Sequence, residues 1–166
     1  MEFYMTVVER LEQVANKASL DLHIAGESSR FDWMKLLLVN PRVKSRFSVE
    51  GETSAIVGMI VVPDPERAHV NEGWNSFDPP DRSTIENLER DGYKGKKVAV
   101  VVIQVWERLH ATVLIPAKQL RQTKRYRDTG NFRILNNGGE FRLQAARYEP
   151  EIRLKDRLQD LLTFLP

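Results

Sequence analysis

The chain has no cysteine and only three histidines among its 166 residues. Without thiols, it has no disulfide cross-links, no thiol catalysis and no metal site with cysteine ligands. The histidines, at positions 23, 69 and 110, lack the His-x-x-x-His spacing of a helical zinc site, and no serine lies in a Gly-x-Ser-x-Gly turn. These absences argue against a zinc peptidase and against a serine hydrolase of the common kind.

Glycine is also scarce, and none of the nine glycines forms a Gly-x-Gly pair or a Gly-x-x-x-x-Gly-Lys loop. The usual dinucleotide fingerprint, the kinase glycine loop and the Walker phosphate loop are therefore absent. No apolar run approaches the ~20 residues that span a bilayer. The first five residues carry an acid and no basic segment, so we expect no secretory signal, no membrane partner and a cytoplasmic protein.

What the chain does have is the composition of a globular protein, with 42% hydrophobic and 29% charged residues. A chain of this length buries roughly 68–70% of its unfolded surface, which gives a core without metal or disulfide support. No internal repeat or low-complexity tract divides it. We therefore expect residues 1–166 to form a single domain that requires no cofactor.

Hydrophobic periodicity predicts an α+β fold. Residues 5–18 have apolar side chains three and four positions apart, as in an amphipathic helix, whereas residues 42–50 alternate as in a half-exposed strand. Residues 98–106 are apolar on both faces, which indicates a central strand. The remaining patterns predict a helix or a buried strand over 29–40, a hairpin of 42–50 with 53–62, a loop over 63–82, a helix over 83–90, a strand over 110–115, a helix over 117–122, a hairpin of 132–135 with 140–146, and an amphipathic helix over 152–165.

Because these strands are joined mainly by turns, we expect a largely antiparallel sheet of about six strands built from hairpins. Amphipathic helices stand at both ends of the chain, and one or two helices lie inside it. A doubly wound parallel sheet does not fit, because it needs a helical crossover after nearly every strand.

Charge is distributed unevenly along the chain. Residues 1–90 carry a net charge of −5 and residues 91–166 a net charge of +7. The densest basic segment, 118–133, has a net charge of +5 and includes interleaved aromatic residues. Cations neutralise phosphates and aromatic rings stack on unpaired bases, so the candidate nucleic-acid contacts here are Lys118, Arg121, Lys124, Arg125, Tyr126 and Arg127.

A second candidate surface follows the strand over residues 42–50. Arg42, Lys44 and Arg46 alternate with apolar residues, so we expect the three cations to form a row on the exposed face. A third basic group is Lys94, Lys96 and Lys97, which lie beside glycines whose backbone can approach a phosphate. Ordinary surface charge is the alternative for all three clusters. In that case the 118–133 segment pairs with residues 64–89, which carry a net charge of −5.

The 63–82 segment suggests a second class of function. It is rich in proline and acidic residues, and loops of this length are often functional. Trp74 and Phe77 are then candidates for an exposed contact with a protein partner or a second copy of the chain. Its acids and His69 do not amount to a predicted metal site, because few ligands converge.

A third alternative is a divalent-metal-dependent nuclease with a degenerate motif. Pro63-Asp64 follows a strand, as the acid of a restriction-nuclease-like pattern does, yet no lysine in the chain has an acid two residues before it. The sequence leaves the catalytic residues of any such activity unassigned. It favours a small nucleic-acid-binding domain with a basic C-terminal half, little sequence specificity and no catalysis of its own.

Overall fold

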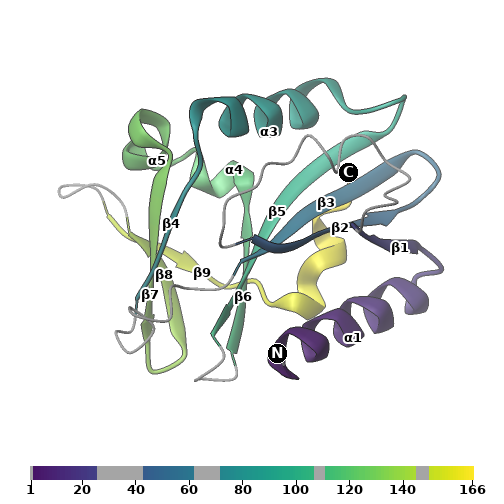
Figure 1. Ribbon diagram of the computed structural model, residues 1–166, viewed down its shortest axis with the longest axis horizontal. Helices are drawn as coiled ribbons and strands as arrows, with labels where there is room; N and C mark the ends of the chain where they lie inside the picture. Colours follow the sequence, from purple (N-terminus) through teal and green to yellow (C-terminus); the bar gives the residue numbers. More distant parts are fainter. Residues whose placement is uncertain (1, 26–42, 62–71, 107–110, 145–149) are drawn as a thin grey trace.

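The computed structural model describes residues 2–25, 43–61, 72–106, 111–144 and 150–166, which contain nine strands in two sheets (Figure 1). The larger sheet has the strand order β1-β2-β3-β5-β6. Its neighbours pair antiparallel except β3 and β5, which run parallel. The strands of this sheet are β1 (Asp21–Ile24), β2 (Val43–Glu50), β3 (Ser54–Val61), β5 (Lys97–Trp106) and β6 (Ala111–Pro116).

The smaller sheet has the order β4-β7-β8-β9 and is antiparallel throughout. Its strands are β4 (Glu72–Ser76), β7 (Asn131–Asn137), β8 (Glu140–Gln144) and β9 (Ile152–Leu154). β7 and β8 form a tight hairpin because Gly138 and Gly139 both take a positive φ, as a two-residue turn of this kind requires.

The helices flank these sheets. The longest are α1 (Glu2–Lys17) and α3 (Pro79–Asp91), and the shorter ones are α4 (Ala117–Leu120), α5 (Lys124–Thr129) and the 3₁₀-helix η2 (Leu158–Phe164). In Figure 1, α3 lies along the top of the molecule, and α1 lies beside η2 at the lower right.

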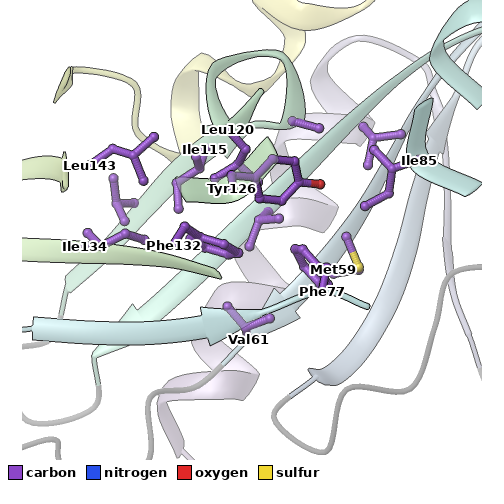
Figure 2. Close-up of a cluster of buried hydrophobic side chains, with 14 of the residues drawn as sticks. Met59, Val61, Phe77, Ile85, Ile115, Leu120, Tyr126, Phe132, Ile134 and Leu143 are labelled. Carbon is purple, nitrogen blue, oxygen red and sulfur yellow. The ribbon is translucent and has the colours of Figure 1, made fainter. Parts of the chain in front are cut away.

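Two hydrophobic clusters lie on opposite faces of the larger sheet. Val98, Val100 and Val102 point to the cluster shared with the smaller sheet, α3, α4 and α5, which Figure 2 shows in part. Val101 and Ile103 point to the cluster shared with α1 and η2. The larger sheet is thus a middle layer, and this explains why β5 is apolar on both faces.

The structure confirms the predicted α+β class and a mostly antiparallel larger sheet. It also confirms the helix near the N-terminus, the β2–β3 hairpin, the central position of β5 and the β7–β8 hairpin. The expected element over 29–40 lies outside the described residues.

Several predicted details are wrong. The strands form two sheets rather than one, and β3 reaches β5 through a crossover that includes β4 and α3. The predicted 63–82 loop contains β4 and the start of α3. The helix begins at Pro79 because two prolines suit its first positions, where no N–H is needed, and because the Asp78 N–H donates to the Asp81 carboxylate (3.3 Å).

The exposure of β2 and the type and length of two predicted helices also differ from expectation. β2 does not present an exposed face at its C-terminal end, because both faces of the sheet are covered there and Ser48 and Glu50 are buried. The predicted C-terminal helix is a strand followed by a 3₁₀-helix: Ile152 and Leu154 alternate with Arg153 and pair with β8. α4 ends at Leu120, and α5 follows as an additional short helix.

Candidate functional site

A groove of about 890 Å³ follows the N-terminal half of β5. Three parts of the fold form its walls: the C-terminal end of α3, the region of α4, and the segment at the end of η2. The side chains of Lys97, Lys118, Gln119, Gln122 and Phe164 line it.

The groove exists because β6 is shorter than β5. The pairing of β6 with β5 begins at Val101, opposite Pro116, after which the chain turns into α4. Residues 97–100 therefore have β3 on one side and no described strand on the other. Such an edge presents backbone groups that have no ladder partner.

Hydrogen bonds show which of these backbone groups face the groove. The Lys97 N–H donates to the Thr53 carbonyl (3.0 Å), on the side of β3. The Val100 N–H donates instead to the Glu89 carboxylate (3.3 Å), on the opposite side. Because backbone groups alternate along a strand, the Val98 N–H also points away from β3, toward the groove.

Glu89 fixes one wall of the groove. Its second carboxylate oxygen forms an ion pair with Arg121. The glutamate is 15% exposed and the arginine 33%, so the pair is partly shielded from water. The ion pair connects α3 to the segment after α4. The other carboxylate oxygen of Glu89 accepts the hydrogen bond from the Val100 N–H at the edge of β5.

The cations around the groove fall into two groups. Lys96 is 3.5 Å from Glu50, and Arg90 is 3.0 Å from Asp91, so both have carboxylate partners. Lys97 and Lys118 are exposed, and they come from different elements that face the same groove. These two lysines are the cations best placed to meet a ligand there.

A smaller pocket of about 430 Å³ lies between α3 and α5. Arg82, Arg121 and Arg127 line it, with Glu86 as its acidic residue. The Arg82 guanidinium donates to the carbonyls of residues 126 (3.1 Å) and 127 (2.8 Å). These contacts hold α5 against α3 and leave the pocket rich in positive charge.

The structure places most cations of the predicted 118–133 cluster in internal contacts. Arg121 pairs with Glu89, and Lys124 pairs with Asp128 one turn along α5. The Arg127 guanidinium donates to the carbonyls of Arg121 (3.0 Å) and Gln122 (3.3 Å), and Arg125 is half-buried. Lys118 is the member of the cluster that reaches the groove.

The expectation of an exposed Tyr126 ring is wrong. The side chain is 3% exposed and meets the rings of Phe77 and Phe132 edge-on (Figure 2). Burial raises the pKa of its phenol to about 12. The ring faces inward because α5 has a single buried position and Tyr126 occupies it, so it cannot stack on a base.

Phe77 is likewise buried, at 2% exposed, so it is not the partner contact that its place beside Trp74 suggested. The reason is that the chain passes from β4 into α3 across the core at this point. Trp74 belongs to β4, and its backbone pairs with Arg133, but its side chain lies outside the described part.

The predicted row of cations on β2 is only partly visible. Arg42 lies outside the described residues, as does the Lys44 side chain. Arg46 is half-buried rather than exposed.

Asp64 and His69 also lie outside the described residues. Within the described ranges, no three acidic or histidine side chains gather as metal ligands. Gln104 on β5 is buried and accepts a hydrogen bond from the Asn75 amide (2.9 Å). No described helix is long and apolar enough to cross a bilayer.

Sequence reasoning pointed to Lys97 only as part of a basic group, and did not identify Gln119, Gln122 or Phe164 as site residues. Their meeting depends on where β6 stops, and on a segment some sixty residues after β5. Pro116 was the available signal, because a proline that ends a strand leaves the neighbouring strand unpaired. Comparison with family models, curated proteins and solved structures finds no match to this chain.

Proposed function

We propose that the chain binds nucleic acid, with the groove beside β5 as the contact for the sugar–phosphate backbone. The observation that carries the proposal is the position of Lys97 and Lys118, two exposed cations from separate elements that face one groove. Lysines of this kind neutralise phosphates and release condensed counterions. The surplus of positive charge in residues 91–166 supports the same assignment.

The proposed binding has little sequence specificity. Contacts with phosphate fix the position of a nucleic acid without reading its bases. The internal ion pairs of Arg121 and Lys124 reduce the share of the 118–133 cluster in this binding. The arginine-lined pocket between α3 and α5 lies next to the groove, because Arg121 borders the pocket and its partner Glu89 borders the groove. Arg82 and Arg127 in this pocket extend the positive surface.

Charge reversal in the groove tests the proposal. Lys97→Glu with Lys118→Glu is expected to weaken binding to a labelled oligonucleotide by at least about tenfold at low salt, since two phosphate contacts are lost. Fluorescence anisotropy in the presence of EDTA measures the affinity.

The matched control is Arg10→Glu with Lys17→Glu. Both residues are exposed on α1 and neither lines the groove, yet the change in net charge is the same. Equal losses in the two double variants would mean that overall charge, not the groove, drives binding. Undiminished affinity in the groove variant would refute the proposal.

A further inference from the structure

We infer that the groove beside β5 takes an unpaired nucleobase, so that the nucleic acid bound there is single-stranded. This inference rests on the proposed function and adds the part of the nucleic acid that enters the groove. The groove, at about 890 Å³, falls within the range of small-ligand sites, so one base with its sugar fits inside it.

An aromatic ring forms part of the groove wall. Phe164, at the end of η2, lines the groove and is half-buried against the α1 side of the core. The preceding turn is held in place because the Thr163 hydroxyl donates to the Asp160 carbonyl (2.6 Å) and the Leu165 N–H donates to the Leu162 carbonyl (3.2 Å). Aromatic rings anchored in this way stack on unpaired bases of any sequence.

Groups suited to the edge of a base lie on the wall that β5 and the α4 region form. Gln119 and Gln122 both line the groove, and an amide side chain offers a donor and an acceptor together. Gln122 is exposed, so its amide is open to a ligand, whereas the Gln119 Oε1 is buried from solvent. The Val98 N–H faces the same space.

These features distinguish a base from a bare phosphate. A phosphate offers acceptors only and gains nothing from the oxygen of the Gln122 amide, whereas the exocyclic amino group of adenine, cytosine or guanine donates to it. Lys97 and Lys118 meet the phosphates that flank the base. A base in a duplex presents neither its face nor its pairing edge, so a duplex is restricted to the backbone contacts.

The test compares single strands and duplexes of one sequence, with 2-aminopurine as the reporter base, by anisotropy and by 2-aminopurine fluorescence. The expected results are an affinity for the single strand at least about tenfold higher than for the duplex, and a change in 2-aminopurine fluorescence on binding. Phe164→Ala is expected to lower the single-strand affinity about tenfold, because the stacking surface is lost.

Leu165→Ala is the matched control, since this neighbouring side chain is also half-buried but does not line the groove. Its single-strand affinity is expected to equal that of the unaltered protein. If Phe164→Ala does not fold, judged by its thermal unfolding, Gln122→Leu replaces it, because leucine keeps the bulk and removes the exposed amide. Its single-strand affinity is expected to fall, and an unchanged affinity would overturn the base pocket.

The outcomes separate this inference from the proposed function. Equal, salt-sensitive affinity for both strand forms with unchanged 2-aminopurine fluorescence overturns the base pocket and leaves backbone binding standing. Loss of affinity in Leu165→Ala equal to that in Phe164→Ala also overturns it. The absence of binding to either form at low salt overturns the proposed function itself.

Discussion

Glu89 on α3 and Arg121 after α4 form an ion pair, and the same carboxylate accepts the Val100 N–H of β5 (3.3 Å). One acidic side chain thus joins three segments around the groove. Arg121, which the sequence suggests as a phosphate contact, is a structural residue in this arrangement.

We expect Arg121→Ala to lower the free energy of unfolding by about 1–2 kcal/mol, between the values for exposed and for buried ion pairs. Glu89→Gln is expected to cost less than Glu89→Ala, because glutamine still accepts the Val100 N–H. Urea denaturation measures all three variants. An Arg121→Ala midpoint equal to that of the unaltered protein would contradict this role.

A buried amide pair links the two sheets. The Asn75 amide donates to the Gln104 side-chain oxygen (2.9 Å), and both residues are almost completely buried. Removing one side chain leaves the other amide without its hydrogen-bond partner. Asn75→Ala and Gln104→Ala are therefore each expected to lower the free energy of unfolding by about 1–3 kcal/mol. The combination of Asn75→Leu with Gln104→Leu is expected to cost less than the sum of the two leucine single variants. Additive losses in this double-mutant cycle would show that the amides act independently.

Gly130 is expected to be intolerant of any side chain. It ends α5 at φ 76°, and a Cβ added there would lie 1.8 Å from the Phe77 carbonyl oxygen. Gly130→Ala should therefore destabilise the fold by more than about 2 kcal/mol, the sum of left-handed strain and a backbone clash. Gly138, at φ 63° with open space around it, is the control, and its alanine variant should lose about 1–2 kcal/mol. Thermal unfolding of both proteins would show the contrast, and similar losses would argue against the clash.

The buried phenol of Tyr126 is expected to make the free energy of unfolding decrease at alkaline pH. Burial raises the pKa of its phenol from 10.0 to about 12 in the folded protein. Below the unfolded value the phenol is neutral in both states, and its contribution is fully present. Between 10 and 12 the unfolded state loses the proton first, so stability falls by about 1.4 kcal/mol per pH unit.

Tyr126→Phe is expected to lack this component of the pH dependence. Urea denaturation of both proteins below and above the unfolded pKa measures the difference. A decline of the same steepness in the phenylalanine variant would contradict the assignment to Tyr126.

The sequence predicts those elements whose pattern follows from local geometry. The four-residue spacing of Val7, Leu11 and Ala15 is that of a helix with one buried stripe. The β-branched 98–106 segment, apolar on both faces, is typical of a strand that is covered on both sides. The glycines at 138 and 139 mark a turn directly.

Pairing partners and the groove do not follow from local geometry. The alternation of apolar and polar residues indicates which face of a sheet a side chain takes, but not which strand lies beside it. The parallel pairing of β3 with β5 therefore could not be predicted from the sequence. Tyr126 lies among charged residues in a six-residue helix. Because such a short helix shows no hydrophobic period, the burial of Tyr126 could not be predicted. The groove joins Lys97, Lys118 and Phe164, whose positions in the sequence carry no shared signal.

The most direct test of nucleic-acid binding at the groove is the salt dependence of affinity for a labelled single strand, measured by anisotropy with EDTA present. Two phosphates neutralised by Lys97 and Lys118 predict that log K falls with log salt with a slope of about −1.4 or steeper, and that Lys118→Glu makes the slope shallower. An affinity independent of salt, or a slope that Lys118→Glu leaves unchanged, would contradict the account.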